Sequence, residues 1–210
     1  MSNWFKSAAK LAGLCVSALV LIFPTGCSAP SLNKAYTSET LERVPDLEGE
    51  WIQVPKPGDE SSVMLVIARA KDALYSVDVR TLNPKADEPA TPQHLLVGIT
   101  KVNGQLFADA TADTEREPLL AHYRDYIIPA HVFARVTFDG TTLAVSPLSG
   151  GGLEKLLKDK PDSINHALAD DNVILTADTT HIREFLAAQQ ANADLFLNEP
   201  MRFSRAPATK

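Results

Sequence analysis

Short runs in which apolar and polar residues alternate, separated by tight turns, dominate the chain from about residue 47 onward. A period of two is typical of strands buried on one face, because successive side chains point to opposite faces of a sheet. Asn103-Gly104 and Asp139-Gly140 suit two-residue hairpin turns, in which both central residues need positive φ. The sequence therefore predicts an antiparallel meander of strands.

The turns also predict which residues face each other across each hairpin. The expected pairs are Ile99 with Ala108 across the first turn and Val136 with Leu143 across the second. The second hairpin then gathers apolar side chains on one face, namely Val132, Ala134, Val136, Leu143 and Val145. Register and apolar pattern agree at both turns.

A third hairpin is predicted around Lys71-Asp72, which is a weaker turn signal than Asn-Gly. It would set Val66 against Val77. Residues 63–68 are apolar on both faces, which indicates that another part of the chain covers the outer side of this strand.

A helix is predicted over about residues 179–197, with Asp178 or Thr179 as its N-cap. Its apolar residues at helical spacing are Ile182, Phe185, Leu186 and Phe196. They are expected to cover the apolar sheet face that contains Val136 and Leu143. The predicted fold is α+β and mainly β: residues 47–205 form one domain, a curved antiparallel sheet or partly open barrel with the C-terminal helix packed on it.

The first 26 residues have the layout of a secretory signal peptide. Lys6 and Lys10 are their only charges, and residues 11–23 are all apolar or small. This run is shorter than the roughly 20 apolar residues that a helix needs to cross a bilayer. A removable signal is therefore the better interpretation than a membrane-spanning helix.

The stretch Pro24-Thr25-Gly26-Cys27 resembles the lipobox of bacterial lipoproteins. In that family the cysteine becomes the first residue after cleavage and carries the lipid, which implies Cys27 as the site of lipid attachment. Ser28 follows in place of the aspartate that would signal inner-membrane retention, so the resemblance implies an outer-membrane protein facing the periplasm. The alternative is a signal cut elsewhere, for example after Ala29, with Cys27 present by chance. Cys15 is interpreted as part of the signal.

Residues 27–46 are polar and irregular, and are predicted to be a lipidated N-terminus and flexible tether about 25 Å long. The whole chain has a net charge of −6, and loss of the two lysines of the signal gives −8. Such an acidic body without a basic cluster argues against binding to nucleic acid.

Gly49-Glu50-Trp51, followed by the meander and a late helix, resembles the lipocalin-like (calycin) family of small barrels. The resemblance implies that Trp51 packs across one end of the barrel and that the interior binds a small hydrophobic molecule. The alternative is that Trp51 is a core aromatic in another β fold. Small residues expected in the interior are Ala68, Ala108 and Ala134.

No catalytic motif stands out in the sequence, so the protein is predicted not to be an enzyme and to need no metal or cofactor. The histidines are scattered without metal-ligand spacing at His94, His122, His131, His166 and His181. His131 is expected to be a solvated or loop-covered surface residue on the polar face of its strand, with Arg135 and Thr137. Two functions remain: an envelope lipoprotein that binds a small hydrophobic ligand, or a non-enzymatic interaction or assembly module of the envelope with a filled core.

Overall fold

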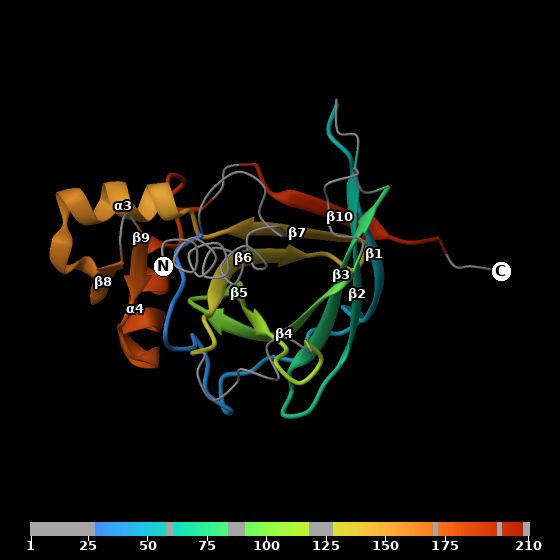
Figure 1. Ribbon diagram of the computed structural model, residues 1–210, viewed down its shortest axis with the longest axis horizontal. Coiled ribbons are helices and arrows are strands. Elements are labelled where there is room, and N and C mark those ends of the chain that lie inside the picture. Colours follow the sequence, from blue (N-terminus) through green and yellow to red (C-terminus); the bar gives the residue numbers. More distant parts are fainter. Residues whose placement is uncertain are drawn as a thin grey trace, which may run out of the picture.

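The computed structural model describes residues 28–57, 61–83, 91–117, 128–169, 172–196 and 199–207. Its main feature is a closed antiparallel barrel of eight strands (Figure 1). The barrel strands are β1 (Gly49–Gln53), β2 (Ser62–Arg69), β3 (Tyr75–Leu82), β4 (Gln93–Val102), β5 (Gln105–Ala112), β6 (Val132–Phe138), β7 (Thr142–Pro147) and β10 (Met201–Arg205). The predicted meander is confirmed. The barrel is closed, because β10 pairs with both β7 and β1.

Between β7 and β10 the chain leaves the barrel and forms a smaller layer. Its elements are α3 (Gly150–Asp159), the 3-10 turn η1 (Pro161–Ser163), the hairpin of β8 (His166–Ala169) and β9 (Asn172–Leu175), and α4 (Thr179–Gln189). Figure 1 shows these elements grouped on one side of the barrel, away from β1, β2 and β3. Asp178 caps α4 as predicted, accepting a hydrogen bond from the His181 N–H at 2.9 Å. The helix ends at Gln189, earlier than predicted.

The predicted strand register is correct at one of the two glycine turns and shifted at the other. At Asn103-Gly104 the predicted register is confirmed, with Ile99 opposite Ala108 and positive φ at both turn residues. At Asp139 the loop is two residues longer on the β7 side, so that Val136 faces Val145. The Asp139 carboxylate accepts hydrogen bonds from the backbone N–H groups of the two following threonines, which stabilises the longer turn. An even shift keeps every side chain on its predicted face.

The register predicted for the third hairpin is wrong by one residue. Val77 faces Ile67 rather than Val66, because the turn extends over residues 70–74 with positive φ at Asp72 and Ala73. A shift of one residue reverses the faces of a strand. Ile67 therefore points into the barrel, and Ala68, which was expected inside, is exposed on the outer face.

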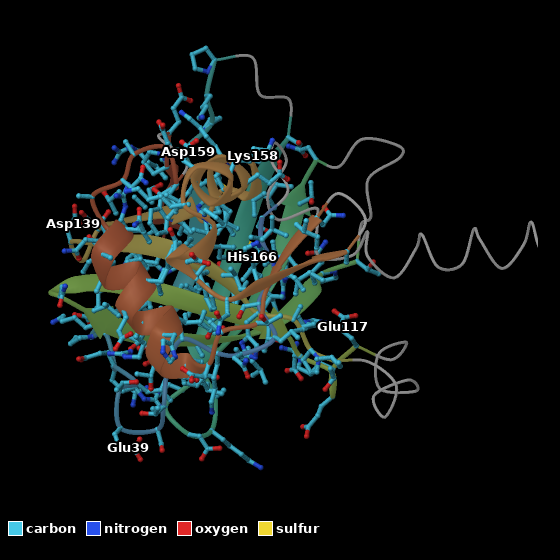
Figure 2. All side chains as sticks on the ribbon, turned by 90° about the vertical axis from the view of Figure 1, so that its left-hand side faces the viewer. Glu39, Glu117, Asp139, Lys158, Asp159 and His166 are labelled. Carbon is cyan, nitrogen blue, oxygen red and sulfur yellow. The ribbon has the colours of Figure 1, made fainter. Side chains whose placement is uncertain are left out.

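Apolar side chains form two separate cores. One fills the barrel interior and includes Val136, Leu143 and Phe203. The other lies outside the barrel, where α3, α4 and β9 cover Phe107 and Phe133. Figure 2 views the molecule with α4 nearest the reader.

The prediction was wrong about which face of the sheet α4 covers. The buried residues of α4, Ile182, Phe185 and Leu186, belong to the outer core with Phe133. The expected partners Val136 and Leu143 face the interior instead. β6 carries apolar side chains on both faces, so it contributes residues to both cores.

Residues 28–46, called here the N-terminal segment, also correct the prediction, because they are bound to the barrel rather than forming a flexible tether. Ser31 exchanges backbone hydrogen bonds with His131 at 2.8 and 2.9 Å. Further along, the Glu42 N–H donates to the carbonyl of Ile99 at 2.7 Å. The Ala29 and Ala35 side chains are buried in the outer core. The segment therefore runs along the outside of the barrel.

Gly98 provides a test of this packing. A Cβ at this position would lie 2.5 Å from Cε1 of the Tyr36 ring in the N-terminal segment. We expect Gly98→Ala to lower the free energy of unfolding by about 1–3 kcal/mol, because the ring has to move. Gly151→Ala is the control, since a Cβ there meets nothing within 4 Å and alanine favours the helix by about 0.5–1 kcal/mol. Equal urea midpoints for both variants would contradict the tight packing of Tyr36.

Candidate functional site

The barrel has two ends of different character, named here after residues that lie at them. The Trp51 end is where β1 begins, and the Ala112 end is where β5 finishes. In an antiparallel barrel the strands alternate in direction, so β1, β3, β5 and β7 all finish at the Ala112 end.

Trp51 seals its end of the barrel. Its side chain is fully buried, and the indole N–H donates to the carbonyl of Leu47 at 2.8 Å. The Phe138 ring meets it edge-on with centroids 5.7 Å apart. On the other side, the guanidinium of Arg205 lies 4.7 Å from the centre of the Trp51 ring. Trp51 thus lies inside the barrel near one end.

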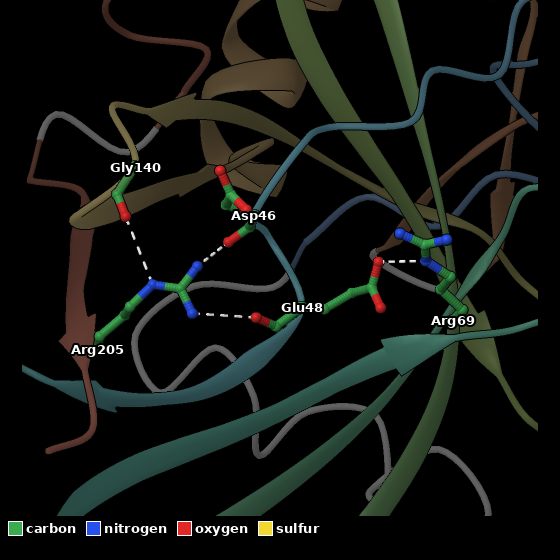
Figure 3. Close-up of a pocket in the computed structure, with 5 residues that line it drawn as sticks. All are labelled: Asp46, Glu48, Arg69, Gly140 and Arg205. Atoms are coloured by element: carbon green, nitrogen blue, oxygen red, sulfur yellow. Dashed lines mark hydrogen bonds and ion pairs between the residues drawn. The ribbon is translucent and has the colours of Figure 1, made fainter. Parts of the chain in front are cut away.

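A cleft of about 480 Å³ lies just outside this seal (Figure 3). Arg205 donates there to backbone carbonyls of Asp46, Glu48 and Gly140, and Arg69 forms an ion pair with the Glu48 carboxylate. Both guanidinium groups are therefore already engaged by the protein. We interpret this cleft as part of the closure of the barrel, since Arg205 holds the segment before β1 against β10 and Arg69 holds it against β2.

Small side chains line the interior near the Ala112 end. Strand β5 points Ala108, Ala110 and Ala112 inward, which places three small side chains in a row along the wall. All three retain partial exposure, whereas Val77 and Phe203 nearer the Trp51 end are buried. Other apolar residues that pack on the interior core with partial exposure occur toward both ends, namely Val63, Leu65, Leu106, Phe138, Val145 and Met201. Part of the apolar interior wall is therefore accessible to solvent.

Gln93 adds a polar group to this interior. Its register partner Val79 points inward, so Gln93 does too. Its Oε1 atom is buried and has no hydrogen-bond partner among the residues that the structure describes. Buried polar atoms are normally paired, so an unpaired acceptor here is suited to a donor group supplied by a ligand or by water.

The sequence interpretation missed the role of Gln93 and of two of the three alanines. Ala108, Ala110 and Ala112 alternate strictly with larger or polar residues in ADATA, the signal that marks an inward row of small side chains. Of the residues predicted to leave interior space, Ala108 and Ala134 do point inward, while Ala68 does not.

The buried pair of Asp109 and His131 lies on the outer face of the barrel, under the N-terminal segment. Asp109 is 1% exposed, and its Oδ1 lies 2.6 Å from His131 Nδ1. Its Oδ2 accepts the backbone N–H of Ala35 at 2.6 Å. His131 therefore lies on the outer face, as expected, and of the two expected environments it has the loop-covered one, because the N-terminal segment covers this part of β6. The pair holds that segment in place.

A second histidine pair occurs around Asp78 on the outer face of β3. His94 Nδ1 lies 2.9 Å from Asp78 Oδ1, and Arg116 donates to the two carboxylate oxygens at 2.7 and 3.3 Å. Burial alone acts to raise the pKa of Asp78, but hydrogen bonds from Arg116 and His94 outweigh it and hold this pKa below its usual value.

The lowered pKa of Asp78 predicts how stability depends on pH. A carboxyl that binds protons more weakly in the folded state stabilises the fold above its ordinary pKa of about 3.9 and loses this effect as the pH falls. We therefore expect Asp78→Asn to destabilise the protein at pH 7, with the difference from wild type shrinking as the pH falls below about 4. Urea unfolding at a series of pH values measures this. A difference that stays constant with pH would contradict the pairing.

The remaining polar candidates do not converge on one site. His181 pairs with Asp178 at 2.8 Å, and with Glu184 it lines an open cleft of about 340 Å³ between η1 and α4. His166 contacts the carbonyl of Ile164, and His122 and Cys27 lie outside the described residues. Among the residues that the structure covers, no group of three or more His, Cys, Asp or Glu is arranged to hold a metal ion. The same residues include no helix with the length and apolar character needed to cross a membrane.

The fold defines the class of protein as a closed, eight-stranded antiparallel β-barrel with an outer helical layer. Comparison of the chain with protein-family models, with curated proteins and with solved structures finds no match. The arguments about function therefore rest on the residues themselves.

Proposed function

We propose that the protein is a lipid-anchored protein of the bacterial envelope whose barrel binds a small apolar or amphipathic molecule at its Ala112 end. The observation that carries the binding proposal is the row of small side chains on the inner face of β5. Trp51 is fully buried at one end of the barrel, while Ala108, Ala110 and Ala112 point inward toward the other end and retain partial exposure. Apolar pockets with a few placed polar groups are the usual form of small-molecule sites.

The expected ligand is slender, with an apolar chain and at least one hydrogen-bond donor. The alanine row accommodates the chain, and the unpaired Oε1 of Gln93 accepts from a hydroxyl, an amide or a protonated carboxyl group. A fully apolar ligand would leave this acceptor without a partner, which costs free energy.

The anchor is supported by the sequence from Pro24 to Cys27, which lies outside the described residues. Cys27→Ser in the full chain tests it. We expect the variant to lose the acyl mass and to leave the membrane fraction, because the several acyl chains of a mature lipoprotein make release negligible. Unchanged mass and fractionation would remove the anchor from the proposal, as well as the outer-membrane location that depends on it.

Native mass spectrometry of the protein purified from its own membrane tests the ligand. The prediction is a second, non-covalent mass that organic solvent removes, in addition to the acyl groups on Cys27. A Gln93→Leu variant should retain less of that mass, whereas the matched change Gln105→Leu, on the outer face of β5 where the amide donates to two backbone carbonyls, should retain it. A chain that carries no extra mass and binds no added amphiphile would favour the alternative, a non-enzymatic interaction module of the envelope with a filled core.

A further inference from the structure

The N-terminal segment begins at the Ala112 end of the barrel. Ser28 pairs with Ser149, two residues beyond the last residue of β7, and Ser31 pairs with His131, directly before β6. Strand β7 finishes and β6 begins at this same end. Ser28, which directly follows the proposed attachment residue in the sequence, is therefore held at the rim of the Ala112 end.

Large apolar side chains are exposed at the same end. Val54 directly follows β1 and is 47% exposed, and Ile128 precedes β6 and is 71% exposed. Leu32, next to Ser31, is 41% exposed. Among the described residues the fourth such side chain is Leu168, in the β8–β9 hairpin, and none of the four lies at the Trp51 end. Val54 and Ile128 lie next to different strands around the rim, and an end that carries such side chains next to the proposed lipid anchor is suited to contact with a bilayer.

We propose that the Ala112 end of the barrel faces and touches the lipid bilayer, so that Leu32, Val54 and Ile128 rest in its interfacial region. This inference depends on the proposed anchor at Cys27. A free tether of some 18 residues would let the barrel turn in any direction, but a segment bound from Ser28 onward leaves no such freedom. The mouth of the interior then opens toward the acyl layer, and the Trp51 end points away from the membrane. The ligand of the barrel is accordingly a bilayer amphiphile that enters from the membrane.

Single cysteines test this orientation in the anchored full chain. Residues 28–210 contain no cysteine, so a cysteine introduced there is the one free thiol once Cys27 is acylated. The rim variants are Val54→Cys and Ile128→Cys, and the matched variants at the Trp51 end are Lys71→Cys and Thr141→Cys, all at exposed positions. Each is labelled with an environment-sensitive maleimide dye in vesicles that contain lipids with a quencher on the acyl chain.

We expect the rim labels to shift their emission to the blue and to lose most of it to the lipid quencher, while the Trp51-end labels keep the emission seen in water. Equal quenching at both ends, or stronger quenching at the Trp51 end, would overturn the orientation. Cys27→Ser, combined with each label, separates the two proposals. If the anchored protein fractionates with membranes but shows no difference between ends, only the orientation fails. If the anchor itself is absent, both fail.

Discussion

Replacing Trp51 by alanine is expected to lower the free energy of unfolding by about 3–5 kcal/mol. The side chain is fully buried, and its removal leaves a cavity at the end of the barrel as well as an unpaired carbonyl at Leu47. The Phe138 ring and the Arg205 guanidinium both lose the surface against which they pack. Urea unfolding followed by circular dichroism measures the loss.

Leu168→Ala is the control for this prediction. Leu168 is 71% exposed, so its truncation should change the stability by less than about 0.5 kcal/mol. If Trp51→Ala costs no more than the control, the Trp51 end is not sealed as described. Arg205→Ala should fall between the two, because it removes the cation over the ring and its carbonyl contacts but leaves the indole in place.

Asp109→Ala is the second large effect, with an expected loss of about 3–5 kcal/mol. The carboxylate is buried, and its removal leaves both His131 Nδ1 and the backbone N–H of Ala35 without their partner. The N-terminal segment should be the first part of the chain to lose stability, because Ala35 belongs to it. Faster hydrogen exchange of residues 29–42, before that of the barrel strands, is the predicted signature.

A double-mutant cycle with His131→Ala separates the pair from its surroundings. Residues in direct contact usually show a coupling free energy of about 0.5–3 kcal/mol. A coupling close to zero would mean that the two side chains do not stabilise each other. The exposed pair of Lys155 and Asp194, 3.0 Å apart, is the comparison, and exposed pairs contribute little.

The strands were predictable because alternation and turn chemistry agreed. Asn103-Gly104 allows positive φ at both turn residues and fixed its hairpin correctly. The Lys71-Asp72 turn lacks such a residue pair, and residues 63–68 are apolar on both faces, so neither the turn nor the pattern could choose between two registers one residue apart. In the structure Val77 pairs with Ile67, which is the register that was not predicted.

The packing between elements was harder to predict than the elements themselves. The apolar residues of α4 were correct, but β6 offers Phe133 outward and Val136 inward, and the helix packs on the outer one. The N-terminal segment looked like a tether because it lacks apolar periodicity. It is held instead by backbone hydrogen bonds and by the buried Asp109, interactions with residues distant in sequence that leave no local pattern.

Titration with a fluorescent fatty alcohol, whose hydroxyl supplies the donor, tests the central claim, that the interior binds an apolar chain at the Ala112 end. Ala110→Phe fills the inward row, and Ala68→Phe makes the same change on the outer face of β2. Ala112→Phe, nearer the mouth, provides a second interior variant should Ala110→Phe lower the stability by the roughly 1–3 kcal/mol typical of overpacking. The account predicts saturable binding by the wild type and by Ala68→Phe, and at least about tenfold weaker binding, equivalent to about 1.4 kcal/mol, by the interior variants. Equal affinities for the inner and outer variants, or no binding by the wild type, would contradict it.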